Sequence, residues 1–231
     1  MLCSKSVLAD QAFRMNAIEI LKGFGLCASL NLYYVEVFSV AVTLVVYTCM
    51  LAIALGVVQR GTSHGVPLKN FVSGVIMSAL ALAFTDPSAA KGPAYMQNTC
   101  GVFTQLIVCL TILAYSADFN KDARLAAAGT VLFSVLANMR AHALHVLTLW
   151  SSVHLAIIPT LDYVTAVRSG VSNPPDLVML ILMVSGTLSL LSWGTFILMS
   201  GLQLMAFTNF VGAIVAMATL KNMLAAKVKA A

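Results

Sequence analysis

Apolar residues in this chain gather into long runs that polar connections separate. The first run, Tyr34–Val58, exceeds the roughly 20 residues that a helix needs to cross about 30 Å of hydrocarbon. Two shorter runs, Phe71–Phe84 and Gly101–Ala117, lie on either side of a proline- and glycine-containing loop at residues 85–93. Because proline and glycine interrupt helices, this pattern predicts a helical hairpin in a thin or protein-covered part of a membrane.

Two further runs, Leu125–Val167 and Leu177–Leu220, are each about twice as long as a perpendicular membrane span. The polar link 168–176 separates them, and Asp176 can cap the second helix. Two arrangements fit these lengths. Each run forms two tightly turned spans, or each forms one long, strongly tilted helix, with Pro159 bending the first. We favour the second arrangement, because no polar turn divides either run.

The runs together predict an all-α polytopic membrane protein with about five membrane crossings. Its last two helices are expected to be long, strongly tilted and arranged as a hairpin. Residues 1–31 mix charged and apolar positions, which favours an N-terminal interfacial, amphipathic segment. Residues 32–231 then form a single transmembrane helical domain. We recognise no internal sequence repeat in it.

Composition supports a membrane location. Hydrophobic residues make up 60% of the chain and charged residues only 9%, whereas soluble domains carry about 25% charged residues. The net charge of +5 lies mostly in short connections and at the chain ends, which is typical of membrane-orienting charge rather than of a nucleic-acid surface. The five cysteines form no CxxC pair, so we expect neither a disulfide framework nor a metal or cofactor site.

Arg140 is the most unusual residue, because it lies midway along the first long run with no acid before Asp162. A guanidinium group stays protonated under ordinary conditions. On insertion scales, an arginine at the centre of a bilayer helix costs about 2.5–3.5 kcal/mol. Such a residue must face protein, water or a partner carboxylate, so we treat Arg140 as a functional candidate.

Other polar residues flank this arginine. At about 100° per residue, Asn138, His142 and His145 share one helix face, and Arg140 lies on the opposite face. Histidines titrate near neutral pH, so this face could relay protons. Structural hydrogen bonds of the two histidines are an alternative. Haem or metal ligation would need ligands from a second helix, and the run after Asp176 has no His, Cys, Asp or Glu.

The second long run carries two amides, Gln203 and Asn209, among many smaller hydroxyl residues. Small and hydroxyl residues usually serve helix packing in membranes. Buried amides are costlier, so one of these two is expected to meet Arg140 or a chain of water molecules.

Two stretches resemble the a subunit of the F-type ATP synthase, the stator half of its proton channel. Residues 137–142, Ala-Asn-Met-Arg-Ala-His, followed by Leu144-His145, are similar to the Asn-Met-to-His part of that family's first long helix. Residues 193–203, from Trp193 to Gln203, are similar to its second long helix. The family's arginine precedes its asparagine by four residues, whereas Arg140 follows Asn138 by two.

The resemblance implies a stator proton-translocating subunit of the Fo sector, which forms two offset half-channels against a rotor ring. Arg140 would face the rotor carboxylate as the essential charge. The implied proton path comprises Asn138, His142, His145, Gln203 and Asn209. The subunit would bind no nucleotide and would not itself be an enzyme. Its implied partners are c-type rotor ring subunits, other Fo and peripheral stalk subunits and lipid, with no nucleic acid, in the mitochondrial inner membrane.

A secondary transporter, or an accessory membrane subunit of a respiratory complex, is the alternative function. Arg140 would then bind an anionic substrate or a lipid head group. The scarcity of carboxylates argues against an autonomous proton- or sodium-coupled transporter, because such proteins usually need an internal acid.

Overall fold

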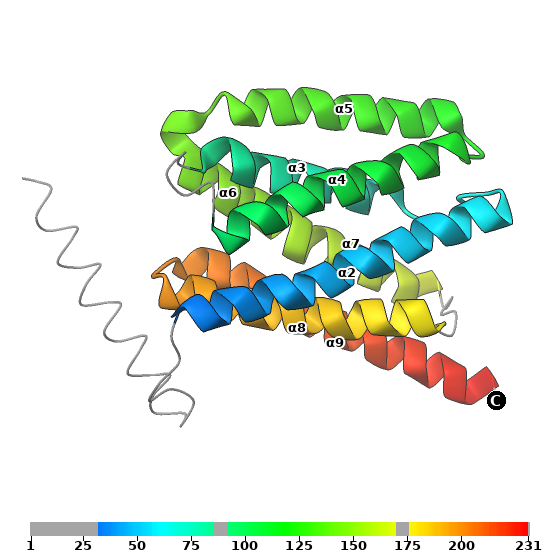
Figure 1. Cartoon of the computed structure of the whole chain (residues 1–231). Coiled ribbons are helices and arrows are strands. Elements are labelled where there is room, and N and C mark those ends of the chain that lie inside the picture. The colour runs from blue at the N-terminus through cyan, green and yellow to red at the C-terminus, as the bar shows by residue number, and fades with distance from the viewer. Residues whose placement is uncertain (1–31, 86–91, 170–175, 231) are drawn as a thin grey trace, which may run out of the picture.

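A computed structural model describes residues 32–85, 92–169 and 176–230, and within these ranges every regular element is a helix. The predicted interfacial segment, residues 1–31, lies outside them. Single helices, as labelled in Figure 1, are α2 (Leu32–Arg60), α3 (Leu68–Phe84), α4 (Pro93–Ala114), α5 (Phe119–Ala137), α8 (Leu177–Met199) and α9 (Gln203–Ala230). Between α5 and α8, four segments follow one another: the 3₁₀-helix η2 (Arg140–His142), α6 (Ala143–Ser151), the π-helix η3 (Ser152–Ile157) and α7 (Ile158–Ser169). We call residues 140–169 the compound helix.

The predicted all-α polytopic membrane fold is confirmed. Five helices are long and apolar enough to cross a membrane: residues 32–60, 93–114, 140–169, 177–199 and 203–225. The shorter apolar helix α3 lies among them, and consecutive helices run in alternating directions along the bundle (Figure 1). Apolar length is a local property, so the sequence alone predicts the apolar segments but not where the two longest of them are divided.

The prediction that residues 125–167 form one long helix is wrong. Helix α5 ends at Ala137, and the compound helix runs back in the opposite direction (Figure 1). Backbone hydrogen bonds close the reversal: Met139 N–H donates to Leu136 O at 3.0 Å, and His142 N–H donates to Met139 O at 2.9 Å. The turn contains neither glycine nor proline, and its polar residues, Asn138, Arg140 and His142, were interpreted instead as groups within a span.

The second long run is also divided, so the expected hairpin of two long tilted helices is replaced by four shorter helices. Helix α8 ends at Met199, and Gly201 follows with a φ of +85°. Gly201 N–H donates to Leu198 O, and Leu202 N–H donates to Ile197 O, each at 3.0 Å. This is the hydrogen-bond pattern of a Schellman motif, which glycine favours because it has no Cβ.

Two three-helix units make up the bundle. In the first triplet, α4 packs against both α2 and α3; in the second triplet, α9 packs against both the compound helix and α8. The triplets meet where α2 contacts α8 and where α3 contacts α6 and η3. Helix α5 connects the triplets and packs on α3 and α4. Each triplet therefore places its third helix between its first and second helices.

In each triplet, a glycine of the third helix lies in close contact with the other two helices. A Cβ on Gly101 of α4 would lie 2.5 Å from Tyr47 Oη of α2 and 2.7 Å from Ser78 Oγ of α3. A Cβ on Gly212 of α9 would lie 2.4 Å from Leu155 O of η3. That Cβ would also lie 3.4 Å from a side-chain carbon of α8. The chain thus contains a structural repeat, which the sequence analysis did not predict.

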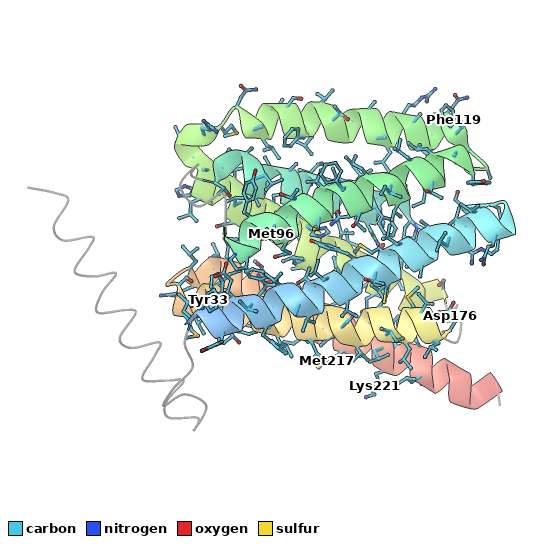
Figure 2. All side chains as sticks on the ribbon, in the orientation of Figure 1. Tyr33, Met96, Phe119, Asp176, Met217 and Lys221 are labelled. Carbon is cyan, nitrogen blue, oxygen red and sulfur yellow. The ribbon has the colours of Figure 1, made fainter. Side chains whose placement is uncertain are left out.

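Positive charge gathers at one end of the bundle. This basic end contains the C-terminal ends of α2, the compound helix and α9 and the N-terminal ends of α3 and α5, as Figures 1 and 2 show. Its described cations are Arg60, Lys69, Lys121, Arg124, Arg168 and Lys221. Figure 2 shows Phe119 and Asp176 at this end and Tyr33 at the other. Among the described residues, Arg140 is the one lysine or arginine at the opposite end.

Candidate functional site

Arg140 lies at the turn between α5 and α6 rather than in the middle of a span. Its side chain is exposed, and Nη2 donates a hydrogen bond to Ala83 O, near the C-terminus of α3, at 2.9 Å. Cations interact favourably with the unpaired carbonyl groups at a helix C-terminus. The position of Arg140 therefore explains how the chain carries a permanent charge without the cost of a mid-membrane arginine.

Asn138, His142 and His145 were expected to share one helix face, but Asn138 lies on a different helix from the two histidines. Asn138 is the C-cap of α5, and its Nδ2 donates to Ser134 O at 2.7 Å. His142 and His145 lie beyond the turn, with their ring centroids 6.4 Å apart and their planes at 74°. The face calculated for one continuous helix fails because the chain reverses between Asn138 and His142. The two histidines remain neighbours, and both are exposed.

His145 and Gln203 are brought together by the turn that ends α8. They line a cavity of about 470 Å³ between α6 and the start of α9. Thr148 and Ser152 add hydroxyl groups to its lining, and most of the remaining lining residues are leucines. Leu149 and Leu204 are each 64% exposed, so the cavity opens on the outer surface of the bundle rather than between the triplets.

The contact between α2 and α8 contains a buried cluster of neutral polar groups. The hydroxyl oxygens of Thr43 and Ser189 lie 2.7 Å apart, and Trp193 Nε1 donates to Thr43 Oγ1 at 3.0 Å. Thr43 also donates to Ser39 O within α2. Thr43 and Ser189 are more than nine-tenths buried. Hydroxyl and indole groups thus join the two triplets without charge.

The contact between α3 and the compound helix is more polar and includes charges. Trp150 Nε1 donates to Ser73 O at 3.0 Å, and Ser73 Oγ lies 2.9 Å from His154 Nδ1. Farther toward the basic end, Lys69 and Asp162 form an ion pair. From the sequence, Asp162 is only the nearest acid after Arg140, because pairing between residues 93 positions apart has no local signal.

Two asparagines occupy matching places in the two triplets. Asn98 Nδ2 donates to Ala94 O in α4, and Asn209 Nδ2 donates to Met205 O in α9, each at 2.8 Å. Neither side-chain oxygen has a hydrogen-bond partner among the described residues. Each asparagine precedes by three residues the glycine that contacts the other two helices of its triplet. Asn209 was predicted as a site residue and Asn98 was not, although Asn-x-x-Gly recurs at residues 98–101 and 209–212.

Within the described ranges, no three His, Cys, Asp or Glu side chains are placed to hold a metal ion. The two triplets thus contribute hydroxyl, amide and indole groups to the interior of the bundle. This set can donate hydrogen bonds to a polar molecule and accept them from it.

Comparison with known proteins identifies the fold. No protein-family model matches the chain, and no curated protein matches it. Among solved structures, the chain is similar to a eukaryotic SWEET transporter, with a TM-score of 0.60 and 16% sequence identity. The match covers 86% of this chain and 100% of the transporter chain. At this identity the similarity establishes the fold.

This match overturns the predicted relationship to the ATP synthase a subunit. The assignment as a stator proton channel with c-type rotor ring partners is wrong, because the structural neighbour is a SWEET transporter. The physical reason lies in the motif. Residues 137–142 span a turn between two helices, whereas the resemblance required them to lie within one long helix. The assignment as a multi-pass membrane protein stands. Membership of an ATP synthase complex and a location in the mitochondrial inner membrane have no support.

Proposed function

We propose that this chain is a membrane transporter that carries a small, neutral, hydroxyl-bearing solute by alternating access between its two triplets. The observation that carries the proposal is the duplicated three-helix unit, with the same helix order and the same glycine contact in each copy. Secondary transporters, SWEET-type proteins among them, are commonly built from such repeats, with the solute near the bilayer midplane where the repeats meet. Rocking of one triplet against the other would expose that site to each side in turn.

The chemistry between the triplets favours an uncharged solute. Thr43, Ser189 and Trp193 join α2 to α8 through neutral groups, and Asn98 and Asn209 each offer a free amide oxygen. Amides and hydroxyls both donate and accept hydrogen bonds, which suits the hydroxyl groups of a sugar or polyol. An anion or a cation would need a countercharge to enter such a site, because unpaired charge is costly inside a membrane.

The acids of the described spans are already engaged, which favours transport down a gradient. Glu36 accepts a hydrogen bond from Ala94 N–H, in the first turn of α4, at 3.2 Å. Asp162 is paired with Lys69. Ion-coupled carriers usually need an internal acid that is free to bind the coupling ion. We therefore expect flux that follows the solute gradient alone.

The charge distribution favours one orientation. Loops with an excess of lysine and arginine stay on the cytoplasmic side of a membrane. The basic end of the bundle, where α2 ends and α3 begins, would then face the cytoplasm. Arg140 and the histidines near it would face the opposite side.

Solute flux into proteoliposomes tests the proposal. Purified protein is reconstituted, and uptake of labelled glucose, sucrose, glycine and lactate is measured with and without an ionophore. We expect uptake of a neutral hydroxylated solute that equilibrates with the gradient and does not respond to the ionophore. If correctly inserted protein moves no neutral solute faster than protein-free liposomes do, the proposed function is wrong.

A variant series tests where the solute binds. Asn98→Ala and Asn209→Ala are each expected to reduce uptake by about tenfold or more, because an unmet hydrogen bond to the solute costs about 1.5 kcal/mol. Asn138→Ala is the matched control. Its amide makes the same bond to the carbonyl four residues earlier but lies at the turn outside both triplets. Equal losses in all three variants would place the solute elsewhere.

A further inference from the structure

One contact between the triplets differs in kind from the others. Lys69, in the first turn of α3, forms an ion pair with Asp162 of α7, with side chains 47% and 35% exposed. Among the side chains that the structure describes, this is the one salt bridge. The second oxygen of Asp162 accepts a hydrogen bond from Asn70 Nδ2 at 3.1 Å. Two adjacent residues of the first triplet therefore hold one carboxylate of the second triplet.

The location of this contact bears on access to the interior. It lies at the basic end, beyond the Ser73–His154 and Trp150–Ser73 hydrogen bonds that join the same two helices deeper in the bundle. The contact between α2 and α8 is instead joined by the neutral groups of Thr43 and Ser189. Among the described residues, the repeated fold therefore packs without an ion pair at the matching place. Lys69 and Asp162 are an addition to the packing rather than a requirement of it.

The same contact has little net stability. Asn70 Oδ1 is buried and has no hydrogen-bond partner. A buried acceptor without a partner loses its hydration and gains nothing in exchange, so it opposes the closed arrangement. Partly exposed ion pairs contribute little net stability, because water screens them. The weakly favourable ion pair is thus offset by the unfavourable burial of Asn70 Oδ1, so a small change in free energy can shift the population between a closed and an open state.

We propose that Asp162, held by Lys69 and Asn70, is a latch that keeps the basic end of the bundle closed. The inference rests on the proposed transport function for its biological meaning. In the closed state, α3 and α7 are joined at this end. Opening toward the basic side requires that the carboxylate leave both partners while the neutral contact between α2 and α8 persists.

Pulsed electron–electron double resonance, which measures the distance between two spin labels, tests the latch without any solute. Spin labels are placed through His64→Cys, in the turn before α3, and Thr165→Cys, on α7. The background has all five native cysteines replaced by alanine. Both label sites are exposed and lie in different triplets. Asp162→Asn and Lys69→Met are each expected to raise the ratio of the longer-distance population to the shorter one by about fivefold, the upper range for a partly exposed pair.

Two further variants make the result decisive. The exchange Lys69→Asp with Asp162→Lys restores the pair with reversed charges and is expected to restore the shorter distance, which a merely misfolded protein would not do. Lys121→Met removes an exposed cation from α5 at the same end and is expected to change nothing. Unchanged distances in Asp162→Asn and Lys69→Met, or an equal shift in Lys121→Met, would overturn the latch. If the protein transports solute in liposomes but the spin-label distances do not change in the variants, the latch alone is wrong. If the distances shift but no solute is transported, only the proposed function is wrong.

Discussion

The glycine contacts predict an ordered series of stability changes. Gly212→Ala adds one methyl group to α9 at the place where η3 and α8 approach it. The new Cβ would lie 2.4 Å from the backbone oxygen of Leu155, whereas ordinary van der Waals contact begins at 3.4 Å. Backbone cannot rotate away as a side chain can, so a helix must move.

The size of the effect follows from the balance of two terms. Overpacking of a tight contact costs about 1–3 kcal/mol. Replacing glycine by alanine inside a helix returns about 0.5–1 kcal/mol through backbone entropy. Gly212→Ala is therefore expected to be destabilising by roughly 1–2 kcal/mol. Gly101→Ala meets the side chains of Tyr47 and Ser78, which can shift, so its cost is expected to be smaller.

Gly186→Ala is the matched control. Gly186 lies within α8, and a Cβ there would meet nothing within 4 Å, so this variant is expected to be neutral or slightly more stable. The assay is thermal unfolding of the purified variants in one detergent. For a chain of this size, each kcal/mol corresponds to a change in Tm of about 2–4 °C. A Gly212→Ala protein as stable as the Gly186→Ala protein would refute the close approach of η3 to α9 and, with it, the repeat of the triplets.

Two other substitutions test the polar contacts. Thr43→Val leaves the part-buried Trp193 N–H without its acceptor and is expected to lower the free energy of unfolding by about 1–3 kcal/mol. Thr48→Val loses only an exposed bond within α2 and should change that free energy by less than about 0.5 kcal/mol in the same melting assay. Arg140→Gln removes one exposed hydrogen bond to Ala83 O and is expected to alter the Tm by no more than about 3 °C, with membrane insertion unchanged in a protease-protection assay. A failure of Arg140→Gln to insert would contradict the assigned place of this arginine at a turn.

Apolar length predicted the apolar segments but not the division of the two longest runs, because the apolar character of a membrane helix is determined locally by about 20 successive residues. The predicted span Tyr34–Val58 lies within α2, and the predicted cap Asp176 accepts a hydrogen bond from Met179 N–H at 2.7 Å at the start of α8. The Schellman turn at Gly201 also had a local signal, a single glycine, which the interpretation of residues 177–220 as one helix passed over.

The reversal after Ala137 had a weaker local signal, because Asn138, Arg140 and His142 are polar but no glycine or proline marks the turn. Its hydrogen bonds join backbone groups that every residue has, and its stability comes from contacts with distant residues. Phe133 and Leu136 of α5 pack on a cluster that contains Ile76 and Leu80 of α3. A motif read along residues 137–142 therefore assigned Arg140 to the middle of a span. Because the resemblance depended on that position, the function inferred from it failed with it.

The sequence by itself determined a membrane protein of apolar helices with neutral polar residues at intervals. Tertiary structure alone decided which of those residues meet. Thr43 and Ser189 are 146 positions apart, and Asn70 and Asp162 are 92 positions apart. Their contacts depend on how two triplets pack against each other, and hydrophobic periodicity within one helix carries no information about the register between helices. The candidate solute path and the latch both lie in contacts of this kind.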